Sequence, residues 1–395
     1  MNTWFIPKPE EFPSQRALLH LGLNKAVRYY RELIVPGIGG TQFVRQFSWA
    51  VAGLTLSENK KKYNSAKIAN SIEALACKLE WKHKKEEYNG KGKLAFSKDD
   101  GKNIWSFKDL SSEQHYVQVT YRMSTVRALA GLGLTTGMRF NSMELTEAGN
   151  ALSETFLNQK NGSNSLKNTL ENWIGKGKSF PKTGNIIQRL NKTDALNKEK
   201  EIIRNCLMAD SAGKLGNPQR RQFLINTFSR YKVNMPELSV IKKKLNEHKD
   251  YVNDIETALA FDEMIECGRR IIHKCAELIG SKSKLAGNDE LNNKLKELCT
   301  KIKAYQNTKG EKHTDADAFT NLIQEKDNAK LLKNIIARDG NILTLSNDNI
   351  IKGHLFGRHK EIKINNEDST TQDNPEEFST ERKIHQLFEL WRDCN

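Results

Sequence analysis

One short motif near the C-terminus has residue types suited to phosphodiester cleavage. Glu361-Ile-Lys363 places a carboxylate two residues before a lysine, and Asp339 lies upstream as a second carboxylate. Metal-dependent cleavage uses acids to hold magnesium and a lysine to orient the attacking water. An ordinary exposed strand in a chain rich in lysine and glutamate would carry the same spacing. A metal-dependent nuclease therefore stays open as one alternative.

A glycine- and lysine-rich stretch, Gly175-Lys-Gly-Lys-Ser179, suggests phosphate binding, because glycines free backbone amides to cradle phosphates. The position of the first glycine of such a loop holds Asn172, and we expect no strand before it. The stretch is better interpreted as a basic loop, without nucleotide hydrolysis.

Histidines and cysteines predict no metal site. His354 and His359 lack a third ligand nearby, and Cys267, His273 and Cys275 lack the spacing of a zinc site. We expect no catalytic residues, no metal and no cofactor.

Basic residues dominate the segment 158–190, which holds six lysines or arginines against one acid. Trp173 and Phe180 lie among them and could stack on bases, while the cations track a phosphate backbone. The alternative is a solvated tether whose aromatic residues pack on a neighbour. The candidate nucleic-acid-binding residues here are Lys176, Lys178, Lys182 and Arg189.

A helix is predicted over 122–134, with Met123, Val126 and Leu129 on its packed face. After it come Thr135-Thr-Gly-Met-Arg-Phe-Asn-Ser and then Met143 to Phe156, in which Leu-Thr-x-x-Gly149 opens the next helix. Thr146 is suited to cap that helix, and Gly149 to a close backbone approach.

The order over about 111–157 resembles the second half of a winged helix-turn-helix module of the multiple-antibiotic-resistance-regulator type. The resemblance implies a recognition helix in the major groove and a wing on the adjacent backbone. Its groove-facing candidates are Arg122, Ser124, Thr125 and Arg127, and its wing contact is Arg139. Two features depart from the family pattern. The wing has a single arginine where several cations are usual, and residues 117–121 alternate like a strand where a scaffold helix is expected. Some winged helices dock proteins instead.

The charge of the whole chain favours a polyanionic partner. Lysine and arginine total 63 against 48 acids, which gives a net charge of +15 and a pI near 9.3. Such a field attracts nucleic acid, although a solvated basic surface would have the same composition. The six cysteines form no Cys-x-x-Cys pair, and no apolar run is long enough to span a membrane. We expect reduced thiols, a cytoplasmic location and no membrane partner.

Helical periodicity predicts the elements that must position these residues. Helices are expected over 15–34, from Thr41 to 54, from 65 to about 80, and over 198–230, 250–279 and 291–305, the last two as antiparallel neighbours. Asp339-Gly340 predicts the turn of a hairpin, and Thr380 the cap of a terminal helix.

The predicted fold class is mainly α: a multi-domain helical protein with a winged-helix-like α+β module and a small C-terminal β-hairpin. The segments are an N-terminal helical region (1–104), the winged-helix-like module (105–157), a basic linker or arm (158–197), a helical domain (198–325), and the hairpin with the terminal helix (326–395).

Charge and resemblance together predict a DNA-binding, non-catalytic subunit of a bacterial multi-protein system. The expected partners are double-stranded DNA and other proteins of a complex. Residues 32–54 resemble uncharacterised bacterial proteins encoded in genome-defence islands, which suggests anti-phage defence. The alternatives are a protein-docking scaffold that uses the winged helix and the metal-dependent nuclease.

Overall fold

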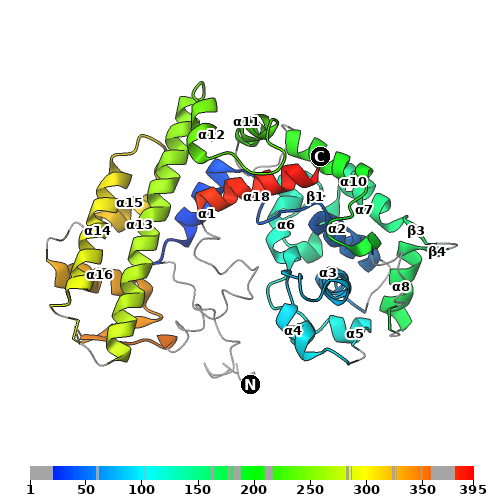
Figure 1. Ribbon diagram of the computed structural model, residues 1–395, viewed down its shortest axis with the longest axis horizontal. Helices are drawn as coiled ribbons and strands as arrows, with labels where there is room; N and C mark the ends of the chain where they lie inside the picture. Colours follow the sequence, from blue (N-terminus) through cyan, green and yellow to red (C-terminus); the bar gives the residue numbers. More distant parts are fainter. Residues whose placement is uncertain are drawn as a thin grey trace, which may run out of the picture. The chain divides into compact units, whose positions relative to one another are not determined.

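The computed structural model describes residues 21–58, 62–102, 104–161, 164–176, 179–180, 188–209, 217–281, 284–285, 287–322, 325, 327–347, 349–356 and 379–395. Helices dominate, and the strands among these residues form three two-stranded antiparallel pairs (Figure 1). The predicted mainly α class with a small C-terminal hairpin is confirmed.

Two compact units divide the described chain. Unit 1 takes its residues from Met1–Ala26, Ala260–Thr308 and Lys312–Asn366, and unit 2 from Val27–Leu259, Lys309–Glu311 and Glu367–Asn395. Most of unit 1 therefore lies, in sequence, between the main part of unit 2 and its last helix, and the described residues 21–26 also belong to unit 1.

Unit 2 contains most of the helices. In chain order they are α1 (Asn24–Ile34, from Val27 onward), α2 (Arg45–Ser57), α3 (Ser65–His83), α4 (Lys93–Lys98), α5 (Phe107–Leu110), α6 (Tyr121–Gly131), α7 (Glu147–Leu157), α8 (Leu166–Lys176), α10 (Asn197–Met208), α11 (Pro218–Phe228), α12 (Leu238–Lys244) and α18 (Thr380–Asp393). Two 3-10 turns, η2 (Glu113–His115) and η3 (Phe140–Ser142), and two short hairpins, β1–β2 (Thr135–Thr136, Glu144–Leu145) and β3–β4 (Lys160–Asn161, Asn164–Ser165), connect them.

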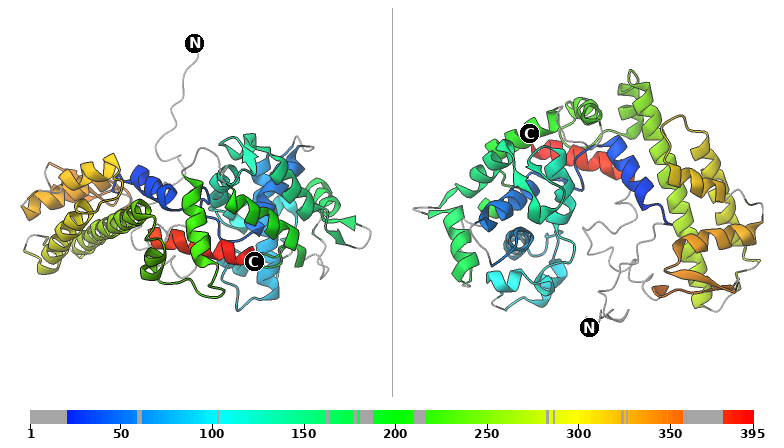
Figure 2. Two further views of the ribbon diagram at one scale, coloured as in Figure 1. Left: turned by 90° about the horizontal axis from the view of Figure 1, so that it is seen from above. Right: turned by 180° about the vertical axis from the view of Figure 1, so that it is seen from behind.

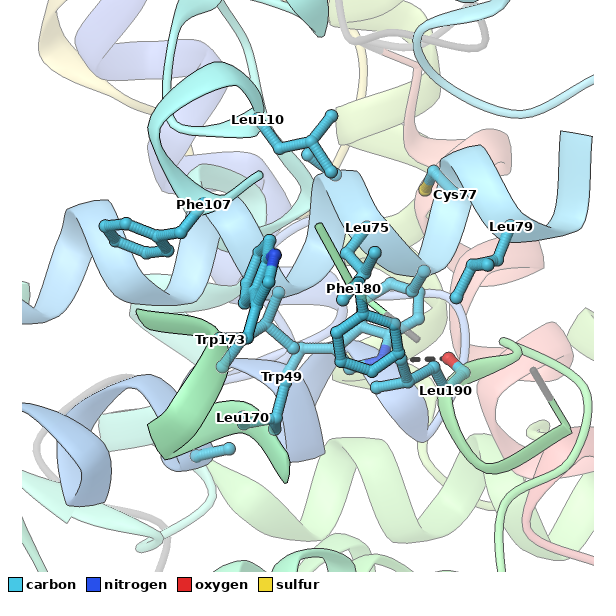
Figure 3. Packing of buried hydrophobic residues seen from close by; sticks show 14 of the residues in the cluster. Trp49, Leu75, Cys77, Leu79, Phe107, Leu110, Leu170, Trp173, Phe180 and Leu190 are labelled. Carbon is cyan, nitrogen blue, oxygen red and sulfur yellow. Dashed lines mark hydrogen bonds between the residues drawn. The ribbon is translucent and has the colours of Figure 1, made fainter. Parts of the chain in front are cut away.

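One aromatic cluster in unit 2 runs across three of the predicted segments. It extends from Trp49 in α2 to Leu190, whose carbonyl accepts a hydrogen bond from the Trp49 indole at 3.1 Å (Figure 3). Phe107 and Trp173 meet edge to face within it, with ring centroids 5.3 Å apart. The predicted boundaries at 104/105 and 157/158 fall inside this shared core, because aromatic residues from all three segments bury one another.

The described part of 158–197 is folded onto that core. The Trp173 indole donates to the carbonyl of Trp105 at 2.9 Å, and the Phe180 amide donates to the same carbonyl at 3.1 Å. Both aromatic side chains are buried and are not available for stacking on bases. The alternative, in which these aromatics pack on a neighbour, is the one observed.

Unit 1 is built on two antiparallel helices, α13 (Lys249–Gly280, from Ala260 onward) and α14 (Asp289–Gln306), which run side by side in Figures 1 and 2. Ion pairs mark the antiparallel register: Glu263–Lys301 at 2.8 Å, Arg270–Glu297 at 3.5 Å, and Lys274–Glu290. The predicted helices over 250–279 and 291–305, and their antiparallel arrangement, are confirmed. Unit 1 is completed by α15 (Thr314–Leu322), α16 (Asn328–Asp339), β5 (Leu343–Ser346) and β6 (Asn349–Lys352).

The C-terminal hairpin exists, but its turn is not at Asp339-Gly340. Asp339 ends α16, and the Gly340 amide caps the helix by donating to the carbonyl of Ile336 at 3.1 Å. The strands begin only afterwards, and Ser346 pairs with Asn349 across the turn. The prediction of a hairpin turn was wrong there because the same dipeptide also suits a helix C-terminus.

Two predicted helix caps are also corrected. Ser379, not Thr380, caps α18, and its hydroxyl accepts from the Arg382 amide at 3.0 Å. Thr41 does not cap α2, which begins at Arg45 after Val44. Thr146 caps α7 as predicted, and accepts from the Gly149 amide at 3.2 Å.

Gly149 lies where α7 crosses the chain entering β1. A Cβ atom at this position would stand 2.0 Å from the Leu134 carbonyl oxygen, so the backbones can approach only with glycine there. We expect Gly149→Ala to lower the free energy of unfolding by about 1–3 kcal/mol, as overpacking does.

Urea unfolding of wild type and of Gly149→Ala measures this loss of stability. Gly280→Ala is the control, because a Cβ at this helical position meets only ordinary contact, at 3.8 Å from the Phe356 ring. We expect the control to keep or slightly raise stability. A Gly149→Ala protein as stable as wild type would contradict the close approach.

Candidate nucleic-acid-binding surface on helix α6

A buried acid fixes the start of α6. Glu73 of α3 is 1% exposed, and its carboxylate accepts from the amides of Tyr121 at 2.6 Å and Arg122 at 2.8 Å. The Tyr116 hydroxyl donates to it at 2.7 Å. Burial raises the pKa of Glu73, while Lys91 and these donors act in the opposite direction. Because Glu73 occupies the first amides of α6, this helix end is closed to a phosphate.

A glycine turn fixes the other side of α6. The Gly40 amide donates to the carbonyl of Ser124 at 2.9 Å. At Gly39, which has a φ of +51°, a Cβ would lie 2.5 Å from the same carbonyl. Backbone therefore packs directly on α6 here, and only small side chains on the helix fit beneath it.

Four carbonyl groups of the segment 33–39, which contains this turn, accept from buried or half-buried side chains. Arg220 donates to Leu33 at 2.9 Å, Tyr251 to Ile34 at 2.6 Å, Arg221 to Pro36 at 3.1 Å, and Lys383 to Gly39. Burial lowers the pKa of Arg221 to about 10. We refer to residues 33–40 as the α1–α2 turn.

Lys383 lies in α18 and is 3% exposed. Burial lowers the pKa of Lys383 from its ordinary value of 10.5 to about 7; nearby Glu32 opposes the shift, and the positive charges of Arg31 and Arg127 add to it. A lysine that titrates near neutral pH thus lies against the turn that supports α6.

The packed face of α6 differs from the predicted one. Met123, expected in the core, is 50% exposed, whereas Ser124 and Thr125 are buried. Their hydroxyls bond back to the Tyr121 carbonyl at 2.7 and 3.0 Å. The α1–α2 turn packs against Ser124, Ala128 and Gly131, which requires small side chains there, so hydrophobicity alone did not determine which face is buried.

The sequence-predicted cations on this module lie in different environments. The Arg122 guanidinium is half-buried; its Nε donates to Asn70 at 2.7 Å, and it covers the Phe140 ring at 4.9 Å. Arg127 and Arg139 are exposed. Because Phe140 follows Arg139 in sequence, the backbone of Arg139 lies close to the residue that the Arg122 guanidinium covers.

No contact among the described residues brings the other predicted nucleic-acid-binding residues next to Arg122, Arg127 or Arg139. Lys176 is exposed in the last turn of α8, and Arg189 is half-buried. Lys178 and Lys182 lie outside the described residues, as do Glu361, Lys363 and His359.

Asp339 has a structural role in the described chain. It is buried, and its carboxylate accepts from the amides of Ile342 at 2.9 Å and Leu343 at 3.1 Å. Among the residues described, no group of three or more His, Cys, Asp or Glu side chains could hold a metal ion.

Sequence reasoning missed Glu73, Arg221 and Lys383. Each is a charged residue inside a helix, and charged residues of a helix are expected on its solvent-facing side. The glycines of Pro36-Gly-Ile-Gly-Gly40 were the available signal of close backbone contact.

Comparison with protein-family models, curated proteins and solved structures gives no match to this chain. No helix in the described part of the chain is long and apolar enough to cross a membrane.

The lowered pKa of Lys383 predicts a pH dependence of stability. Between about pH 7 and 10.5 the unfolded chain binds the Lys383 proton and the folded protein does not. Stability should therefore rise with pH across this window, and the cost of burying the charge is fully present below it.

We expect Lys383→Met to flatten this rise in denaturant midpoints measured from neutral to alkaline pH. Lys198→Met, at an exposed helical position, is the matched control and should keep the wild-type slope. Equal slopes in wild type and Lys383→Met would show that Lys383 does not titrate in this range.

Proposed function

We propose that the protein binds double-stranded DNA as a non-catalytic subunit of a bacterial multi-protein system, with anti-phage defence as its setting. The order α6–β1–η3–β2–α7 supports this, since it is the order of elements in the second half of a winged helix. The net charge of +15 supplies the attraction to a polyanion.

The exposed face of α6 is the observation that carries the proposal. At about 3.6 residues per turn, the exposed Met123 and the half-buried Val126 and Ala130 form the middle of this face. The half-buried Arg122 and the exposed Arg127 lie at its edges. A narrow apolar strip suits contact with thymine methyl groups in the major groove, and arginines at its edges suit phosphates or guanine.

Two of the residues implied by the resemblance have no place in this contact. Ser124 and Thr125 are buried, so the proposed interface uses Arg127 and Arg139 for phosphate contacts. Arg122 holds its position through Asn70 and Phe140 and borders the same face.

A salt series with a labelled duplex tests the proposal by fluorescence anisotropy. We expect wild type to bind with a steep salt dependence, and Arg127→Ala with Arg139→Ala to lose roughly tenfold in affinity. The double variant should also reduce the slope of log K against log salt by about two, one per lost phosphate contact.

Lys296→Ala with Lys330→Ala is the control, because it removes the same charge from exposed positions of unit 1. If both double variants weaken binding equally, the effect is net charge and the α6 surface is not the interface. If wild type does not bind a duplex at low salt, the proposed function is wrong.

Docking of a partner protein is the second candidate, and the exposed methionines favour it. Met123 is 50% and Met138 is 71% exposed, and such flexible apolar side chains are common on protein-binding surfaces. In that case, Met123→Glu would abolish co-purification of a defined partner and leave the denaturant midpoint unchanged. Retained co-purification would exclude docking through this face.

A further inference from the structure

Lys383 connects the C-terminal helix to the proposed interface. Its ammonium group donates to the Gly39 carbonyl, and the neighbouring Gly40 amide donates to Ser124 of α6 at 2.9 Å. Arg127, which is exposed on that helix, interacts electrostatically with Lys383. Lys383 thus contacts the turn that packs on α6, the helix that carries the proposed phosphate contact.

The charges facing Lys383 come from two neighbouring helices. Arg31 and Glu32 approach from α1, and Arg127 from α6. Within α18 itself, His385 pairs with Glu389 at 3.6 Å, and Arg382 contacts His385 at 3.4 Å. One acid therefore opposes two arginines around the buried lysine, and this excess of positive charge disfavours its protonation.

A phosphate group at Arg127 would relieve that excess. The bound anion would offset the repulsion between Arg127 and Lys383, and would make a proton on Lys383 less costly. Because coupling between two binding events is reciprocal, protonated Lys383 must in turn tighten the binding of the anion.

We propose that Lys383 regulates DNA binding at Arg127 through its protonation, so that the protein binds a duplex more tightly as Lys383 gains its proton. This regulation rests on the proposed function, since it acts on the same α6 surface. Lys383 is a positioning residue and touches no DNA.

Duplex affinity measured by anisotropy at about pH 6 and about pH 8.5, at constant ionic strength, tests the coupling. We expect the gain in affinity at the lower pH to be roughly fivefold greater for wild type than for Lys383→Met. Titration of histidines and of the duplex affects both proteins equally, so these effects cancel when the gain in affinity of wild type is divided by that of Lys383→Met. Lys198→Met should behave as wild type.

Calorimetry provides a second readout. The apparent binding enthalpy near pH 7, measured in two buffers of different ionisation enthalpy, should show proton uptake on binding by wild type and less by Lys383→Met. Denaturant midpoints confirm that the variant is folded under these conditions.

The possible failures are distinct. If no protein binds a duplex at either pH, the proposed function is wrong and the regulation is wrong with it. If wild type binds, but the pH ratio and the proton uptake are the same in Lys383→Met, DNA binding stands and the regulation is overturned.

Discussion

The carbonyl oxygens of the α1–α2 turn impose the constraint on which unit 2 depends. A buried carbonyl without a donor costs free energy comparable to a lost hydrogen bond. Here the donors are Arg220 and Arg221 of α11, Tyr251 of α13 and Lys383 of α18. Because these donors come from helices far apart in sequence, the turn is satisfied only when unit 2 has assembled.

The last helix belongs to unit 2 for the same reason. Lys383 reaches the carbonyl of Gly39, and the Asp393 carboxylate accepts from the Val44 amide at 2.8 Å, just before α2. The chain thus returns after the whole of unit 1 to complete contacts at the beginning of unit 2. Burial of the Lys383 ammonium group is unfavourable because the charge is removed from water. Without the lysine, however, the Gly39 carbonyl would lose its hydrogen-bond donor. Burial and the charges of Arg31 and Arg127 lower the pKa of Lys383 to about 7, against the opposing effect of Glu32, while the amino group can donate to Gly39 in either protonation state.

Sequence periodicity predicted the elements that bury one continuous apolar stripe, such as α3, α13 and α14. It did not predict the orientation of α6, since the backbone at Gly39 packs against Ser124 and Ala128, where only small side chains fit. It also missed buried charges such as the Arg45–Glu199 pair, at 3.2 Å. A charge is buried only where its partners converge, and those partners lie up to hundreds of residues away in sequence.

Folding does not remove the positive excess that the sequence contains. Among the described residues, the buried lysines and arginines are equal in number to the buried aspartates and glutamates. The net charge of +15 is therefore carried by the rest of the chain, which includes the exposed Arg127 and Arg139. A field of this size attracts any polyanion without selecting a site. Selection requires cations held in fixed positions. Buried contacts fix α6 to Glu73 at its start and to the α1–α2 turn at Ser124, Ala128 and Gly131. These buried contacts fix the backbone that carries Arg127, which net charge alone would not do.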